Sequence, residues 1–578
     1  MDSLPPETIE KIVSYLDDKN RRILRAINSQ WFSVVKYSDF TFYLTTKSDL
    51  RQIAKRLVTY LWPIEIAFKK TNQLTQRAFM KYLPRITNLV GLKLPTDANC
   101  ISVVDSLTTL TNLQSLDADI YMNSIGKFSN LTSIRIAREE LNENFSNLKI
   151  YTNLESISLS FEVGLNQPDL FEYFSNPTRI TALYLKNNGL KNTKNISRFV
   201  NLKSLGHQTG QKLPLNFPEL EELYAISPEL LEGLETCSNL TSLDLDSETH
   251  IDTGDFSQYS TCISSLSMLK KLRIANKHDS CLDKSMKILL AMPHLEEFTY
   301  QPKHGREYVY DDAFSYIISK NLTKLKCLVN NNRTSTANCI RHIGKLTTLL
   351  ELNMTLEYEP GALSSPVDYE PIMNLTNLTK LEVMGRGMRS HVLPKNIFGL
   401  NKLRILSVHA PDVRANLSAL PNLEMIDLGV VNRETFVSIS TLTLLTSLQI
   451  FVKTKEIEFS PLKDMTLLRN LNIKPSTGLS AWSQLSTLTD LRQLWLAELD
   501  TEESTAQLAY LQKLTYLHCT NKTARTLVVP TQLTSLQVFS LESEHVPQEM
   551  VSKMVKKLPH MRRWCVTTVE QQALNPND

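Results

Sequence analysis

One apolar phrase returns along most of this chain and limits the folds open to it. The phrase is Leu-x-x-Leu-x-Leu, in which Ile, Val, Met, Phe or Cys can replace Leu. About 21 copies begin between Leu89 and Met561, on average roughly 24 residues apart. The Leu-x-Leu step is typical of a short strand with one buried face. A coil of this length buries its leucines only against neighbouring coils, so we expect a solenoid with one continuous core.

The phrase and its spacing resemble the leucine-rich-repeat family over roughly four fifths of the chain. The resemblance implies α/β repeats stacked into a curved solenoid, or horseshoe. We place the repeats at residues 89–569, followed by a tail at 570–578. Residues 37–88 alternate in apolar character at 40–44 and 64–68 and have helical periodicity at 50–61. We therefore expect them to form cap strands and a helix at the end of the array.

A second pattern occupies residues 1–36. Leu4 and Pro5 open it, and proline pre-sets the backbone for the start of a helix. Apolar residues then recur at helical spacing as far as Trp31. The stretch from Leu4 to Trp31 resembles an F-box, which implies a three-helix domain at residues 1–36.

An N-terminal F-box followed by leucine-rich repeats resembles the substrate receptors of SCF-type ubiquitin ligases. In that family the F-box binds the Skp adaptor of a cullin–RING ligase, and the repeats hold a protein substrate for ubiquitination. The alternative is a ligase-independent protein-binding scaffold whose N-terminal helices only cap the solenoid. Carried over by position, the adaptor-binding residues are Leu4, Pro5, Ile9, Ile12, Leu16, Leu24, Ile27 and Trp31.

Residues that flank the second Leu of each phrase point away from the core and are open to a partner. Trp495, Tyr516 and His518 lie on consecutive coils, so we expect them to be neighbours. Exposed aromatic side chains are common anchors of protein interfaces. The alternative is that Trp495 is half covered by its neighbours and binds nothing. The candidates on this face are Phe451, Gln493, Trp495, Tyr516 and His518.

Four successive coils between residues 301 and 394 leave their strands through long polar segments. Solenoid geometry places these exits on one edge. One segment is acidic and the next is basic, so the two can pair with each other. Otherwise they form a rim that selects a substrate, with Tyr308, Tyr310, Arg386 and Arg389 as candidates.

Charge and motifs exclude several other classes of function. The net charge is +3, with 63 basic and 60 acidic residues, which predicts no broad surface for nucleic acid or membrane. Asp2, Glu7 and Glu10 interrupt the N-terminal apolar pattern, so we expect no signal peptide. No GxxxxGKS/T, HExxH or GxSxG motif occurs, and we therefore expect a protein that is not an enzyme and needs no cofactor.

The eight cysteines have no CxxC spacing and no accompanying His cluster. We expect core-facing, reduced thiols in a cytoplasmic or nuclear protein, and no metal site. Asn-x-Ser/Thr sequons such as those at Asn130, Asn239 and Asn374 are then by-products of a recurrent Asn-Leu-Thr phrase and not glycosylation sites.

Overall fold

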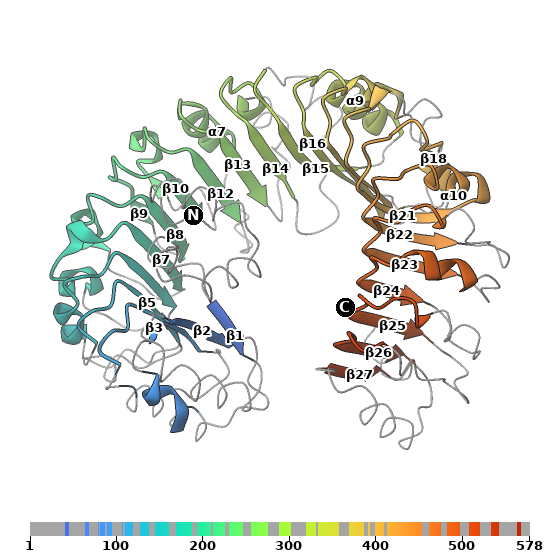
Figure 1. Ribbon diagram of the computed structural model, residues 1–578. Helices are drawn as coiled ribbons and strands as arrows, with labels where there is room; N and C mark the ends of the chain where they lie inside the picture. The colour runs from blue at the N-terminus through green and yellow to red at the C-terminus, as the bar shows by residue number, and fades with distance from the viewer. Residues whose placement is uncertain are drawn as a thin grey trace, which may run out of the picture. The chain divides into compact units, whose positions relative to one another are not determined.

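A computed structural model of the 578-residue chain describes the coils of the repeat array (Figure 1). The coils fall into two compact units, residues 1–243 and 244–578. The eight adaptor-binding candidates, the helix expected at 50–61 and the tail lie outside the described residues. Described are 41–44, 64–68, 79–94, 107–118, 128–137, 145–160, 169–187, 193–209, 212–225, 231–246, 256–275, 288–301, 320–330, 333–357, 369–392, 399–409, 413–452, 462–475, 482–496, 508–520, 533–542 and 563–567, with short gaps at 80, 87–88, 108–109, 387–390 and 415.

Strands of the first unit's main sheet pair in parallel, each with the next strand of that sheet along the chain. The strands expected at 40–44 and 64–68 are confirmed as β1 and β2, and β2 continues the sheet into β3. The boundaries of the N-terminal domain and of the cap stay predictions. The strands are β1 (Thr41–Leu44), β2 (Ile64–Phe68), β3 (Leu89–Lys93), β4 (Ser115–Ala118), β5 (Ser133–Ala137), β6 (Ser156–Ser160), β7 (Ala182–Asn187), β8 (Ser204–Thr209) and β10 (Glu222–Ala225), with a small second sheet of β9 (Leu213–Pro214) and β11 (Leu231–Glu232).

The second unit repeats the arrangement from β13 onward, again with parallel pairs. Its strands are β13 (Lys271–Ala275), β14 (Glu297–Tyr300), β15 (Lys324–Asn330), β16 (Glu351–Glu357), β17 (Lys380–Arg386), β19 (Ile405–His409), β21 (Met425–Val431), β22 (Ser447–Val452), β23 (Asn470–Pro475), β24 (Gln493–Leu496), β25 (Tyr516–Thr520), β26 (Val538–Glu542) and β27 (Arg563–Thr567). Short strands β18 (His391–Val392) and β20 (Val413–Arg414) form a side ladder, and β12 (Ser242–Asp246) contains the boundary between the units.

The strands whose burial the structure describes have the buried face that the solenoid repeat predicts. In the copy around β24, Leu491, Leu494 and Leu496 are all buried. Each buried leucine contributes about 1.5–3 kcal/mol of transfer free energy, and it contacts the same positions of the coils before and after it. The phrase therefore acts as a set of leucine columns that run from coil to coil within a unit.

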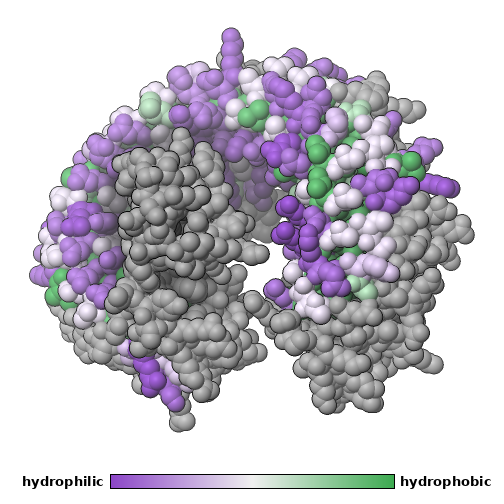
Figure 2. Space-filling model, viewed as in Figure 1, coloured by the Kyte–Doolittle hydropathy of each residue, from purple (hydrophilic) through white to green (hydrophobic). Residues whose placement is uncertain are grey.

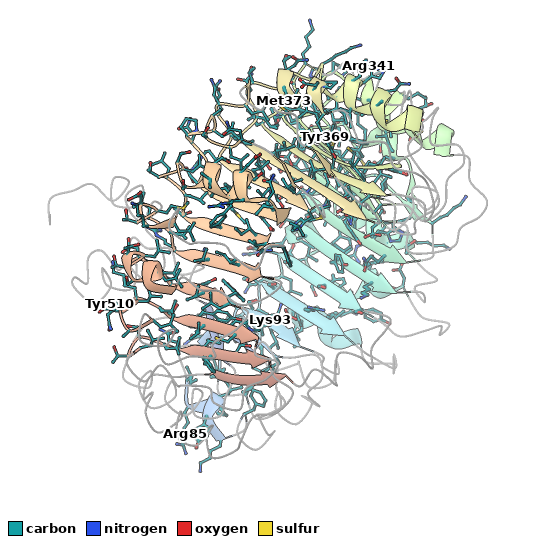
Figure 3. The ribbon with its side chains drawn as sticks, turned by 90° about the vertical axis from the view of Figure 1, so that its right-hand side faces the viewer. Arg85, Lys93, Arg341, Tyr369, Met373 and Tyr510 are labelled. Atoms are coloured by element: carbon teal, nitrogen blue, oxygen red, sulfur yellow. The ribbon has the colours of Figure 1, made fainter. Side chains whose placement is uncertain are left out.

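Turns and short helices return the chain between strands. Helix α10 (Arg433–Ile439) begins where the Asn432 side chain accepts a hydrogen bond from the Thr435 backbone N–H at 2.8 Å, an N-cap. Beside helix α9 (Arg333–Ile343), Tyr369 is buried, while Arg341 is exposed (Figure 3). The remaining elements are α7 (Phe256–Ser264) and the 3-10 helices η2 (Leu83–Arg85), η4 (Phe145–Ile150), η5 (Leu170–Tyr173), η6 (Pro177–Arg179), η7 (Lys194–Arg198), η9 (Leu234–Thr236), η11 (Glu370–Asn374) and η14 (Trp482–Thr487).

The recurrent Asn-Leu-Thr phrase has a structural task. The Asn377 side-chain amide donates to the Thr347 carbonyl of the preceding coil at 3.0 Å, and the Thr379 hydroxyl donates to the Leu350 carbonyl at 3.0 Å. The copies at Asn130 and Asn239 make the equivalent bonds to their own preceding coils. The Asn amide bonds a carbonyl in the turn of the preceding coil, whereas the Thr hydroxyl bonds a carbonyl that already accepts backbone N–H groups, as Leu350 does from Thr379 and Lys380. Both bonds tie a coil to the one before it, which explains why the sequon recurs in register with the repeat.

One buried carboxylate joins two coils of the first unit. Asp169 accepts hydrogen bonds from the backbone N–H of Phe171 at 3.1 Å and from the backbone and side chain of Asn195 at 2.8 and 2.9 Å. Arg198 crosses the same junction and donates to the carbonyls of Phe171 and Glu172 at 3.1 and 3.2 Å. Backbone groups that a 3-10 turn leaves unpaired are therefore satisfied by side chains of the neighbouring coil.

The cysteine prediction is confirmed for most of the thiols that the structure describes. Cys237, Cys327, Cys339 and Cys519 are buried and form no disulfide, and Cys262 is partly exposed. Burial raises the pKa of the Cys327 and Cys519 thiols, so both are held as inert neutral groups. Among the described residues there is no helix able to span a membrane and no cluster of three potential metal ligands.

Candidate functional site

The solvent face of the second unit's sheet consists of two rows of side chains that alternate with the buried leucines. The strand register aligns each row from β13 to β26. The first row is Lys271, Glu297, Lys324, Glu351, Lys380, Ile405, Met425, Ser447, Asn470, Gln493, Tyr516 and Val538. The second row is Arg273, Thr299, Lys326, Asn353, Glu382, Ser407, Asp427, Gln449, Asn472, Trp495, His518 and Ser540.

From β13 to β17 the two rows are charged, with Thr299 and Asn353 as the exceptions. Opposite charges alternate from strand to strand, so that Lys324 lies 3.4 Å from both Glu297 and Glu351. These carboxylates raise the pKa of Lys324. Such exposed pairs add little to stability, but a partner docking here would have to desolvate them. This half of the face is therefore a poor place for a dry interface.

From β21 to β26 the same rows carry little charge, and we call these twelve positions the low-charge patch. It contains one carboxylate, Asp427, and no lysine or arginine. Met425 is 39% exposed, and the patch also presents amides and aromatic rings. Figure 2 shows hydrophilic residues along the inner edge of its right-hand part, with near-neutral and hydrophobic residues beside them. Depletion of charge together with aromatic enrichment is typical of the core of a protein interface.

The predicted aromatic neighbours lie together in the low-charge patch. The rings of Trp495 and Tyr516 have centroids 4.8 Å apart with an interplanar angle of 41°. His518 lies beside Trp495 in the register, and its Nδ1 is 2.9 Å from the Ser540 hydroxyl. Trp495, Tyr516 and His518 are each partly exposed, and Gln493 is exposed. A partly covered Trp495 is also what the non-binding alternative predicts, so binding by these residues stays a prediction.

Other candidates are only partly brought together. Phe451 is partly exposed at the third outward position of β22, outside the two rows. Tyr308, Tyr310 and Arg389 lie outside the described residues. Arg386 ends β17, where the register pairs its backbone with Glu357 of β16. This register fits the expectation that the acidic and basic segments meet, while the rim itself stays a prediction.

A His–Asp pair at one end of the low-charge patch was not among the predicted residues. His409 donates from Nε2 to Asp427 Oδ2 across adjacent strands at 3.2 Å. The hydrogen bond to Asp427, assisted by the charges of Asp427 and Glu382, raises the pKa of His409 above its ordinary value, although burial opposes the shift. Neither residue belongs to a sequence motif, and the register alone brings them into contact.

Replacing Asp427 with asparagine is expected to lower the pKa of His409 toward 6.5, because the charge that favours the imidazolium is lost. The folded-state pKa is raised, so the stability that the pair contributes is present below about pH 6.5 and disappears as the pH rises through the raised value. NMR titration of ¹³Cε1-labelled histidine, assigned with a His409→Gln variant, measures the shift. Glu382→Gln should lower this pKa less, and an unchanged pKa in Asp427→Asn would contradict the pairing.

A second aromatic cluster lies on the solvent face of the first unit. Tyr184 and Tyr224 stack with ring centroids 6.2 Å apart, and Gln208 donates to the Tyr224 hydroxyl at 2.7 Å. Gly206 lies between them in the register, where a Cβ would stand only 1.9 Å from the Tyr184 ring. The absence of a side chain at Gly206 thus allows the Tyr184 ring to lie across the strand.

Comparison with known proteins gives a family match for the N-terminal segment and only remote structural likenesses for the repeat array. Residues 1–43 match the family model of the F-box domain. No curated protein matches the chain by sequence. Among solved structures, a leucine-rich-repeat protein of Leptospira interrogans is 18% identical, with a TM-score of 0.39 over 75% of this chain and 96% of that one. A chain of the mouse RP105/MD-1 complex is 14% identical, with a TM-score of 0.48 over 87% and 86%.

InlJ of Listeria monocytogenes is 17% identical to this chain, with a TM-score of 0.38 over 67% of this chain and 72% of that one. Likenesses at this level say nothing about binding, and the fold assignment rests on the parallel strands and leucine columns of the chain itself. The described coils are those of a leucine-rich-repeat protein. The chain therefore combines a match to the F-box domain model at residues 1–43 with leucine-rich-repeat coils.

Proposed function

We propose that this chain is the non-catalytic substrate receptor of an SCF-type ubiquitin ligase. The order of its parts carries the proposal: an F-box at residues 1–43 precedes a repeat array that presents a low-charge, aromatic patch. F-box domains in general bind the Skp adaptor of cullin–RING ligases. The repeats would then hold a protein substrate, with the low-charge patch as its docking surface, in a cytoplasmic or nuclear complex.

The receptor would contribute proximity and no chemical group. Holding a substrate lysine near the conjugating enzyme raises its effective concentration and turns an encounter in solution into a reaction within one complex. F-box and leucine-rich-repeat proteins are in general adaptors of this kind. A paired, partly buried patch such as Trp495 and Tyr516 suits this role, because binding needs a dry contact and no reactive side chain.

A double substitution in the F-box tests the proposal. Leu4→Ala with Pro5→Ala should abolish recovery of the Skp adaptor in a pull-down, because both side chains fall on its expected contact surface. Lys11→Ala, a polar position between apolar ones, is the matched control and should leave recovery unchanged. Hydrogen exchange of the coils checks that the repeats are intact in each variant. Equal recovery from wild type and double variant, or recovery from neither, would refute the assignment.

The scaffold alternative has one observation in its favour. Strand β1 pairs with β2, and the end of a repeat sheet needs a cover to prevent edge-to-edge association. If residues 1–36 only supply that cover, the chain binds no adaptor, and deleting them causes aggregation. If residues 1–36 are a ligase module, the pull-down above recovers the adaptor with the intact chain.

A further inference from the structure

We propose that the low-charge patch binds a substrate segment with a basic side chain at Asp427 and an apolar side chain on Trp495 and Tyr516. This inference rests on the proposed function, because it names the class of substrate that the receptor holds. It is carried by unmatched acceptors, by the absence of cations in the patch, and by the distance between the two anchor points.

The acceptors lie in the second row of the patch. Asp427 Oδ1 and Asn472 Oδ1 are both buried and have no hydrogen-bond partner. Between them, Gln449 accepts a hydrogen bond from the Asn472 amide at 3.1 Å. Leaving a buried acceptor unsatisfied is unfavourable, because the group has lost its hydrogen bonds to water without replacing them. Neighbouring side chains cover both oxygens in the unbound protein, so a ligand reaches them after a rotamer change of the kind that commonly accompanies binding.

The charge of the patch favours a cationic side chain of the ligand. No lysine or arginine occupies its rows, and the partner that the structure gives the Asp427 carboxylate is a histidine. An acidic segment would find no lysine or arginine in these rows to pair with, whereas an arginine or lysine of the ligand finds the Asp427 carboxylate and the amide oxygens of Gln449 and Asn472. Arginine is the better fit, because its fork of donors can satisfy several oxygens at once.

The distance between the anchors sets the spacing within the ligand. Asp427 and Trp495 are three strands apart in the same row. With strands about 4.8 Å apart, the separation is about 14 Å, which an extended chain covers in about four residues at about 3.3 Å each. The segment therefore crosses β21 to β24 with its basic and apolar residues about four positions apart.

A display selection tests this chemistry without a known substrate. A random 12-residue peptide library is selected on the immobilised full-length chain and sequenced. Selection is repeated on Asp427→Asn and on Asp490→Asn, a matched control. Asp490 is a carboxylate outside the patch, on the turn before β24, where it pairs with Lys513. Single peptides are then synthesised, and their affinities are measured by fluorescence polarisation at two salt concentrations.

We expect wild type and Asp490→Asn to enrich peptides with arginine or lysine about four positions from an apolar residue. Peptides selected in this way should bind Asp427→Asn about tenfold to hundredfold more weakly, the range expected for a lost hydrogen bond to a charged group. Their affinity should also fall as salt is added. Enrichment of acidic or uncharged peptides, an equal affinity for Asp427→Asn, or no enrichment at all would overturn the proposal.

The peptide selection can fail or succeed independently of the pull-down that tests the proposed function. Adaptor recovery depends on residues in the F-box, and peptide selection depends on the second unit, so each can fail alone. Basic peptides without adaptor binding would leave the recognition chemistry standing on a ligase-independent scaffold. Adaptor binding without basic peptides would keep the receptor and remove this class of substrate.

Discussion

Replacing Phe199 with alanine is expected to destabilise the coils between residues 148 and 202 by about 3–5 kcal/mol, the usual cost of removing a buried phenylalanine. Phe199 is fully buried, and its ring meets those of Phe171 and Phe174 edge to face, with centroids 5.6 and 5.7 Å away. The ring joins two turns, η5 and η7, that are otherwise held together by Asp169 and Arg198. A cavity there removes dispersion contacts and edge-to-face attraction together.

The effect should be local, because each repeat depends mainly on its neighbours. Hydrogen exchange with mass spectrometry is therefore a better measurement than a single melting temperature, which is poorly defined for a long array. Peptides within residues 148–202 should exchange faster in Phe199→Ala, while coils of the second unit stay protected. Val200→Ala, at the adjacent and 44% exposed position, is the control and should change little. Equal protection in both variants would contradict the packing described.

The repeat fold could be read from the sequence because its signal is redundant. A single short phrase with two buried positions is compatible with several folds. When the same phrase returns at a steady spacing, one arrangement remains in which all the leucines are buried. The copy at Leu491 illustrates this, since each of its three apolar positions is in the core. The return segments carry no such redundancy, and the placing of helix α10 depends on a single local cap at Asn432.

The candidate site could be predicted in outline and not in its polar details. Outward positions follow from alternation, so the proximity of Trp495 and Tyr516 was expected and is found. Alignment of the repeat copies would also have shown where charge stops, because Lys380 is followed in its row by Ile405 and Met425. The contact of His409 with Asp427 depends on rotamers and on the offset between two strands, which no repeat pattern encodes.

The Asn-Leu-Thr phrase shows the same limit. The sequence marks it as recurrent and separates it from glycosylation, but a sequon alone does not say what its side chains bind. Only the stacking of coils reveals that Asn377 and Thr379 reach carbonyls about thirty residues earlier in the chain. Side-chain hydrogen bonds of this kind depend on how one coil is aligned on the next. Apolar periodicity predicts which residues belong to each coil, but it does not predict that alignment.

Replacing Trp495 with alanine is expected to weaken binding of peptides selected on the low-charge patch by about 2–4 kcal/mol, or roughly thirtyfold or more. The indole is the largest side chain of the two rows and lies against Tyr516, so its removal takes away both the contact area and the support of the neighbouring ring. The surrounding amides add little affinity of their own, because they exchange hydrogen bonds with water for similar bonds with a ligand. Fluorescence polarisation with one labelled peptide measures the loss.

Tyr510→Ala is the matched control, since Tyr510 is 61% exposed on the turn before β25, away from the strand rows (Figure 3). It should bind the peptide as wild type does. Trp495→Phe should retain part of the affinity, because a smaller ring still covers Tyr516. Hydrogen exchange of β24 and β25 separates a lost contact from a disordered strand, since a true anchor can be removed without loss of backbone protection. If Trp495→Ala binds like the control while the strands stay protected, Trp495 is a half-covered surface residue, and the anchor must be sought elsewhere in the low-charge patch.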